Sequence, residues 1–163
     1  MRRFSSLFRQ HLDRFARAWV DEIYADGRTD LATILSAREM VEHLPEVFDE
    51  LGYLLDERAG PDEIAAAAPR LRCLAQARFQ QGVLIDEVAR ELMLFREALC
   101  EFLWEEGPRV VEGDVRELRG ALRRTRLFCD ELIAQAILVY AASLRPVVPT
   151  RGSVWPPPRR RKK

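Results

Sequence analysis

The sequence predicts an all-α fold: a single helical bundle with a long C-terminal helix, followed by a basic, proline-rich tail. Two observations lead to this expectation. Ala, Leu, Arg and Glu, which favour helices, make up nearly half of the 163 residues, and apolar residues recur every three or four positions along most of the chain. One domain of this length can bury its own core. We therefore expect a helical domain over residues 1–145 and a disordered tail over residues 146–163.

The first two helix signals lie near the N-terminus. Apolar residues at helical spacing run from Phe4 to Ile23, and Gly27 follows the point where this pattern stops. Ser36 and Glu39 then have the S-x-x-E spacing of a capping box. The pattern predicts one long amphipathic helix and a second helix that begins after Ser36.

Prolines and glycines divide the next part of the chain. Pro45 has no backbone N–H, so it is expected in the first turn of a helix that ends before Gly60. By the same reasoning, Pro69 is expected to open a helix that runs to about Gln81. Gly82 then breaks the helical pattern.

Two long helices are predicted for the C-terminal half. Apolar residues alternate at threes and fours from Ile85 to Phe102, and this helix is expected to end near Gly107-Pro108. Asp114 is placed to cap the last helix, which is predicted over residues 115–144.

The last helix carries two apolar stripes, a wider face than a helix at the edge of a bundle requires. One reading is that one stripe packs inside the domain and the other against a second copy of the chain. The other reading is a central helix buried on two sides of one bundle. The residues predicted for the dimer helix are Leu118, Leu122, Cys129, Leu132, Ile133, Ala136, Ile137 and Tyr140.

The formal net charge of zero hides an uneven distribution. Six of the 26 basic residues, and none of the 26 acidic ones, lie in residues 146–163, so the rest of the chain carries a net charge of −6. An acidic body binds phosphate poorly. Only the tail is expected to attract nucleic acid or an anionic membrane, and only weakly. Its terminal cluster is Arg159, Arg160, Arg161, Lys162 and Lys163.

The sequence contains no catalytic signature and no local metal-binding motif. The three cysteines form no C-x-x-C pair, which argues against a disulfide framework and fits a reducing cytoplasm. The N-terminus has no apolar signal region, and no stretch is long enough to span a bilayer. His11 and His43 lie on separate predicted helices without ligand spacing. We therefore predict no enzyme activity, no cofactor, no metal ligands and no haem.

One candidate polar site lies on either side of Gly82. A sharp turn at this glycine would bring Arg78 back toward Asp86 or Glu91, and Arg96 follows on the same helix. The favoured interpretation is a structural ion pair that fixes the two helices. The alternative is an arginine that senses a ligand.

Four segments resemble a known bacterial signalling family. LSAREMVEHLPEVFDELGYLL (35–55), RFQQG (78–82), ELMLFR (91–96) and FCDELIAQAILVY (128–140) are similar, in order and spacing, to the N-terminal domain of RsbRD-type co-antagonists. Related domains precede histidine kinases. The resemblance implies a globin-like bundle without haem that forms dimers and acts as a sensory input. The chain departs from the family pattern at Leu74, Leu84 and Leu92, where His, a capping Ser and an aromatic residue are usual.

Together these features predict a non-catalytic cytoplasmic signalling domain of the stress-response or two-component type. It would form a homodimer through the last helix and bind a regulatory protein, of the kinase or anti-sigma class. The alternative hypothesis is an adaptor that holds nucleic acid or an anionic membrane through its basic tail.

Overall fold

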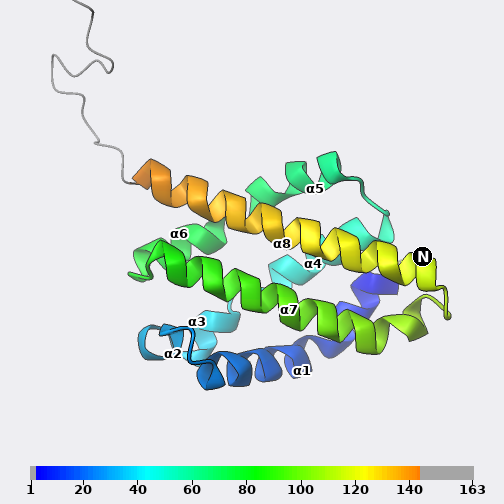
Figure 1. Cartoon of the computed structure of the whole chain (residues 1–163), viewed down its shortest axis with the longest axis horizontal. Helices are drawn as coiled ribbons and strands as arrows, with labels where there is room; N and C mark the ends of the chain where they lie inside the picture. Colours follow the sequence, from blue (N-terminus) through cyan, green and yellow to red (C-terminus); the bar gives the residue numbers. More distant parts are fainter. Residues whose placement is uncertain (1–2, 144–163) are drawn as a thin grey trace, which may run out of the picture.

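The computed structural model describes residues 3–143, and every regular element in this range is helical. Three long helices run along the molecule: α1 (Arg3–Ala25), α7 (Ile85–Val110) and α8 (Val115–Ser143). In Figure 1, α7 lies between α1 and α8, with α4 behind them. The shorter elements are α2 (Leu31–Ile34), α3 (Ala37–Val41), α4 (Leu44–Asp56), α5 (Pro61–Ala67), the 3-10 turn η1 (Ala68–Leu71) and α6 (Arg72–Gln80). The prediction of an all-α fold with a long C-terminal helix is confirmed.

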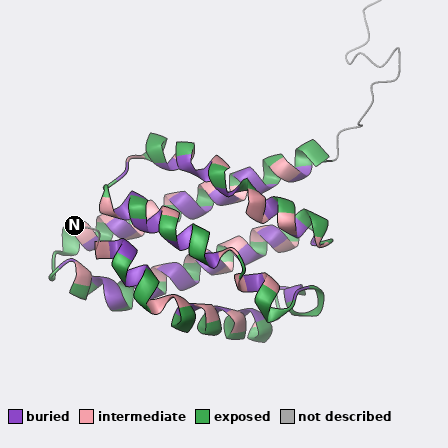
Figure 2. Ribbon diagram, turned by 180° about the vertical axis from the view of Figure 1, so that it is seen from behind, coloured by how far each residue is buried: buried purple, intermediate pink, exposed green. Residues whose placement is uncertain are grey.

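An aromatic cluster forms the part of the core between α1, α4 and α7. The ring of Phe15 meets Phe48 at 5.0 Å, and Phe95 and Phe102 each at 5.8 Å, between centroids. All three contacts are edge-on, the arrangement that aromatic quadrupoles favour. Figure 2 shows that the buried residues of each long helix face the neighbouring helices, whereas the exposed residues face outward. Phe4, Phe8, Phe15 and Trp19 of α1 are buried, so this part of the predicted apolar pattern belongs to the core.

The first turn of α1 is held by the last turn of α4. Asp56 accepts hydrogen bonds from the backbone N–H groups of Phe4 and Ser5, at 2.7 and 3.1 Å, and from the Ser5 hydroxyl at 2.7 Å. These N–H groups have no partner within a helix, so a carboxylate here acts as a cap supplied from a distance. Gly52, one turn earlier on α4, lets Ser5 approach closely, since a Cβ there would lie 2.8 Å from the Ser5 Cα.

The sequence-based helix boundaries hold at several caps. Ser36 and Glu39 form the predicted capping box at α3, and Pro45 lies in the first turn of α4. Asp114 accepts hydrogen bonds from the backbone N–H groups of Arg116 and Glu117, at 2.9 and 3.2 Å, which caps α8.

Two prolines behave differently from the prediction. Pro69 does not open an α-helix but lies in η1, and α6 begins at Arg72. The tighter 3-10 turn places the residue that lacks an N–H between two helices. Helix α7 does not end near Gly107 but continues through Pro108 to Val110. The cost is small there, because Pro108 lies in the last turn and hydrogen bonding resumes with Val111 donating to the Gly107 carbonyl at 3.0 Å.

None of the helices between residues 3 and 143 combines the length and the apolarity that a membrane span requires. The predicted tail, residues 146–163, lies outside the described residues. The basic cluster from Arg159 to Lys163, and the role predicted for it, are therefore not placed by the structure.

Candidate functional site

Arg78 occupies the centre of a buried polar network between α6, α7 and α3. Its side chain is only 4% exposed. Nε and Nη2 donate to the two oxygens of Glu91 at 2.9 and 2.7 Å, the two-point geometry that a guanidinium forms with a carboxylate. Burial opposes the charge of Arg78, but the hydrogen bonds and the charge of Glu91 outweigh it, and the pKa of Arg78 is raised.

The remaining donors of Arg78 reach two other segments. Nη1 donates to the Gln81 side-chain oxygen at 2.9 Å and to the Glu39 backbone carbonyl at 3.2 Å, and Nη2 also donates to the Met40 carbonyl at 3.4 Å. A guanidinium has five N–H groups, and all five are used here. Arg78 thus joins the end of α3 to α6 and α7.

The turn between α6 and α7 has the geometry that the network needs. Gly82 has a φ of +79°, which residues other than glycine adopt at a cost. Val83 N–H donates to the Arg78 carbonyl at 3.0 Å and Gly82 N–H to the Phe79 carbonyl at 3.1 Å, the two bonds of a Schellman cap. The segment RFQQG (78–82) therefore ends a helix and supplies two members of the network, Arg78 and Gln81.

Tyr140 connects this turn to α8. Its hydroxyl donates to the Val83 carbonyl, and its ring meets Phe79 edge-on at 5.3 Å. Burial, together with the negative charge of Glu91, raises the pKa of Tyr140. The hydroxyl is therefore a neutral donor at physiological pH.

The space beside the Arg78–Glu91 pair is small. A cavity of about 30 Å³ lies against both side chains and is otherwise walled mainly by apolar residues, among them Leu74, Val88 and Leu132. This is room for about one or two water molecules, whereas small-molecule sites commonly measure about 300 to 1,000 Å³. The geometry favours the structural interpretation of Arg78, and a ligand-sensing role stays a prediction.

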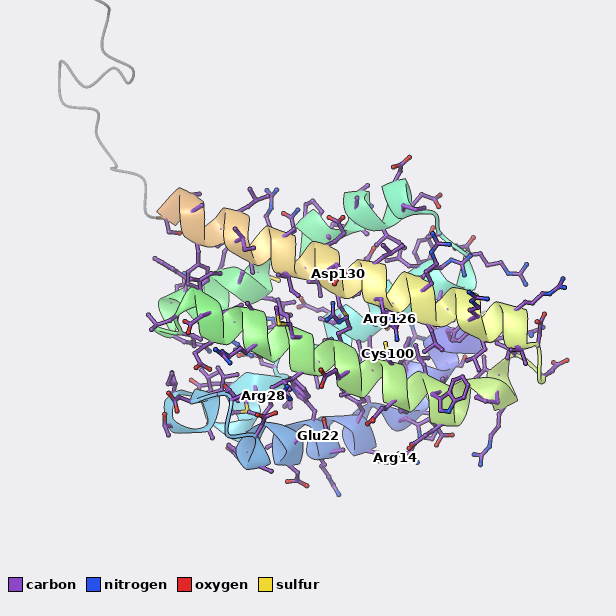
Figure 3. The ribbon with its side chains drawn as sticks, in the orientation of Figure 1. Arg14, Glu22, Arg28, Cys100, Arg126 and Asp130 are labelled. Atoms are coloured by element: carbon purple, nitrogen blue, oxygen red, sulfur yellow. The ribbon has the colours of Figure 1, made fainter. Side chains whose placement is uncertain are left out.

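The other two residues predicted for this site lie apart from it. Over residues 3–143, Asp86 forms neither a hydrogen bond nor an ion pair with Arg78. Arg96 instead pairs with Asp130 of α8. Arg96 and Asp130 line a groove of about 580 Å³ between α7 and α8, together with Cys100 and Arg126. Figure 3 shows Cys100, Arg126 and Asp130 on the outer surface of α7 and α8.

Most residues predicted for a dimer helix are buried within the single chain. Helix α8 packs against α7, α6, α5 and α4. Five of the predicted residues are buried, two are half-buried, and Ile137 is 52% exposed. The buried ones are Leu118, Cys129, Leu132, Ala136 and Tyr140, and the half-buried ones are Leu122 and Ile133. This arrangement favours a central helix for most of the two stripes and leaves the outer side of α8 for another contact.

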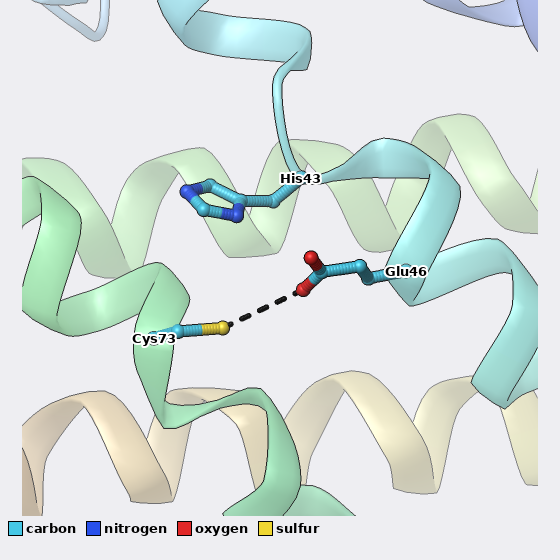
Figure 4. A group of neighbouring side chains, drawn as sticks. All are labelled: His43, Glu46 and Cys73. Atoms are coloured by element: carbon cyan, nitrogen blue, oxygen red, sulfur yellow. Dashed lines mark hydrogen bonds between the residues drawn. The ribbon is translucent and has the colours of Figure 1, made fainter.

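A third group of polar residues was not predicted from the sequence. His43, Glu46 and Cys73 come together where α4 and α6 begin, with their ligating atoms all within 4.8 Å of one another (Figure 4). The H-x-x-E spacing of His43 and Glu46 is the only local signal, because Cys73 is brought in by the fold. His11, in contrast, lies on α1, with its ring against Phe102 at 5.7 Å.

A family model described as the RsbT co-antagonist protein RsbRD N-terminal domain matches residues 13–151. The chain belongs to this family. The resemblance noted in the sequence is thereby confirmed, and the three residue groups described above all lie inside the matched range of this RsbRD N-terminal domain. No curated protein and no solved structure is significantly similar to the chain. The globin-like arrangement that the resemblance implies therefore stays a prediction.

Proposed function

We propose that this RsbRD N-terminal domain is a non-catalytic, cytoplasmic signalling domain that forms a homodimer and acts on a regulatory protein. The family description, a co-antagonist of RsbT, supports a partner of the stress-response type, in the kinase or anti-sigma class. The observation that carries the dimer is the outer surface of α7 and α8, which we call the α7–α8 face.

The α7–α8 face exposes large apolar side chains. Trp104 on α7 is 65% exposed, and Ile137 on α8 is 52% exposed. Single exposed apolar residues are ordinary on a protein surface. Here Trp104 and Ile137 lie on two adjacent helices, and aromatic residues are enriched in protein interfaces.

The same face is also divided by charge. The exposed ridge of α7 carries the acidic residues Glu97, Glu101 and Glu105, whereas that of α8 carries a basic stripe. The stripe consists of Arg116, Arg119, Arg123 and Arg126. A two-fold axis presents the same surface from both copies. When α7 of one protomer crosses α8 of the other, each acidic ridge meets a basic one, so the surface is complementary to itself.

Light scattering coupled to size-exclusion chromatography tests the dimer. Wild-type protein at micromolar concentration is expected to have twice the mass of the chain. Ile137→Arg is expected to give a monomer with an unchanged circular dichroism spectrum, because the side chain is half exposed and each copy would bring a positive charge to the proposed contact in place of an apolar side chain. Tyr53→Arg, an equally exposed position on α4, is the matched control and should stay dimeric. A wild-type chain that is monomeric throughout a dilution series would remove the dimer.

Calorimetric titration tests the partner. An RsbT-type regulatory protein from the same organism is titrated into the full chain, and saturable binding is expected. If no heat of binding is measured at two temperatures with both proteins folded, this part of the proposal is contradicted. The proposal of a homodimer would not be affected.

A further inference from the structure

Three side chains that commonly bind metal ions meet at one corner of the molecule. His43 directly precedes α4, Glu46 lies in its first turn, and Cys73 lies in the first turn of α6. Their ligating atoms are all within 4.8 Å of one another, and Figure 4 shows Glu46 and His43 on the side of α4 that faces Cys73. They combine nitrogen, oxygen and sulfur donors from two helices, which distinguishes the group from an ordinary acidic cluster.

An ion pair beside the cluster connects the segments that carry these residues. His43 and Glu46 are three residues apart and therefore share one side of the helical turn. One turn further along α4, Glu50 accepts a hydrogen bond from Arg70 of η1 at 3.1 Å. This ion pair joins α4 to the turn that directly precedes α6, next to the cluster.

The distances suit a tetrahedral ion. Zn²⁺ binds thiolate sulfur at about 2.3 Å and carboxylate oxygen at about 2.1 Å, and tetrahedral angles then separate the two ligand atoms by about 3.6 Å. The Cys73 Sγ and Glu46 Oε2 are 3.6 Å apart. The His43 nitrogen lies within 4.8 Å of both atoms. Its side chain is only half-buried, so ion binding would require the imidazole to move toward them.

We propose that His43, Glu46 and Cys73 form a Zn²⁺ site with three protein ligands and a fourth position open to water. The donor set selects the metal. Mg²⁺ and Ca²⁺ prefer oxygen ligands throughout, whereas zinc accepts imidazole, carboxylate and thiolate together.

The alternative is a thiol–carboxylate hydrogen bond with a histidine nearby. Cys73 donates to Glu46 in the structure, and burial, together with the charge of Glu46, raises the pKa of the thiol. A divalent cation reverses this balance, because a coordinating thiol loses its proton to solvent when the metal–sulfur bond forms. The two alternatives therefore differ in whether a metal binds with a thiolate ligand.

The site has a consequence for the Arg78 network. Arg78 already joins α6 to the carbonyls of Glu39 and Met40, just before His43. A metal bridge between Cys73 and His43 would add a second link between the same two segments. Zinc binding is therefore expected to stiffen the joint between α3, α4 and α6, whether or not the chain forms a dimer.

Cobalt titration of the reduced, full chain tests the site. Co²⁺ replaces Zn²⁺ and gives an intense sulfur-to-cobalt charge-transfer band only when a thiolate is a ligand. Wild type is expected to show this band with one equivalent of Co²⁺, and Zn²⁺ should displace the Co²⁺. Cys73→Ser should lose the band, and Cys100→Ser, the other half-exposed thiol, should keep it.

A competition assay with Zn²⁺ provides the second measurement. Loss of groups that merely orient zinc ligands costs about 10- to 100-fold in affinity, so His43→Ala and Cys73→Ser should each weaken binding by at least about tenfold. Circular dichroism shows whether these variants fold. Residues 144–163 contain no His, Cys, Asp or Glu and cannot supply the ligands. Absence of the charge-transfer band in wild type, or a band that disappears in Cys100→Ser and not in Cys73→Ser, would overturn the proposal.

Discussion

At the scale of single residues, Arg78 is the side chain whose surroundings are most fully specified. Its five donors meet a carboxylate, an amide oxygen and two backbone carbonyls. Removing the guanidinium would strand Glu91, which is itself buried. The cost of such a change comes mostly from the partner left without compensation.

Arg78→Ala is therefore expected to lower the free energy of unfolding by about 2 to 4 kcal/mol. Urea denaturation, monitored by circular dichroism, measures this free energy of unfolding. Glu91→Gln should cost less, because the amide keeps an oxygen that accepts from the guanidinium. Arg78→Lys should also destabilise, since an ammonium has three donors in place of five.

Arg9→Ala is the matched control for Arg78→Ala. Arg9 pairs with Asp49 at 3.4 Å, and both side chains are more than 60% exposed. Exposed ion pairs contribute little to stability, so this variant should unfold close to wild type. An Arg78→Ala variant as stable as Arg9→Ala would show that the network is not structural. It would favour the alternative, in which Arg78 senses a ligand.

Glu39 makes stability depend on pH. The N–H and hydroxyl of Ser36 donate to its carboxylate, and these bonds lower its pKa below the ordinary value of 4.5. A carboxyl with a lowered folded-state pKa stabilises the fold above its unfolded-state pKa, and this contribution is lost as pH falls through the folded-state value. The stability difference between wild type and Glu39→Gln should therefore shrink below about pH 4.5. A difference that is constant from pH 7 to pH 3 would contradict this.

At the scale of helices, the close packing of α1 against α4 depends on Gly52, because glycine has no side chain. A Cβ at Gly52 would lie 2.8 Å from the Ser5 Cα and 3.2 Å from the Ser5 backbone N. Backbone atoms do not rotate away as the end of a side chain does. The two helices would have to separate, and the hydrogen bonds from Phe4 and Ser5 to Asp56 would stretch.

Gly52→Ala is expected to destabilise the protein, although alanine is the better helix former by about 1 kcal/mol. Gly120→Ala in α8 is the matched comparison. Its Cβ would meet only the end of Arg124, at 2.9 Å from Nη1, so it should gain up to about 1 kcal/mol. Thermal unfolding of both variants gives the signs. If both are stabilised, the close approach of α1 to α4 does not limit the packing.

The helices were predictable wherever a local rule applied. The Ser36 capping box, the Asp114 cap and the turn at Gly82 depend on residues within a few positions of one another, and the structure has all three. Pro69 and Pro108 were misjudged because packing decides how much of a lost hydrogen bond a helix tolerates. A Cβ at Gly107 would lie 2.6 Å from Leu118 Cδ1, so α7 packs closely on α8 next to Pro108.

The polar groups were also predictable only where the residues lie close together in the sequence. The Arg78–Glu91 pair could be proposed from the sequence because Gly82 lies between the two residues. The bonds from Arg78 to the Glu39 and Met40 carbonyls could not, since the residues are almost 40 positions apart. The meeting of His43 with Cys73 is of the same kind, because it depends on how the fold brings the starts of α4 and α6 together.

At the scale of the whole molecule, the inner and outer sides of α8 differ in what they contact. Its inner side packs against four helices, which accounts for most of the apolar width seen in the sequence. Its outer side holds Ile137 and the basic stripe beside the acidic ridge of α7. A dimer formed by the α7–α8 face would therefore be specified by charge as well as by apolar area.

Charge exchange between the two ridges tests this arrangement directly. Glu101→Arg and Arg123→Glu should each weaken the homodimer, because either change places like charges opposite one another across the two-fold axis. A mixture of the two single variants should form a heterodimer, since Glu101 of the second chain then meets the native Arg123 of the first and the two exchanged residues meet each other with opposite charge. Added salt should reduce all these differences, because exposed charges are screened within about 8 to 10 Å at physiological ionic strength. Native mass spectrometry of isotope-labelled mixtures distinguishes the species. If the single variants dimerise as well as wild type and the mixture shows no preference for the heterodimer, the two copies do not meet through these ridges.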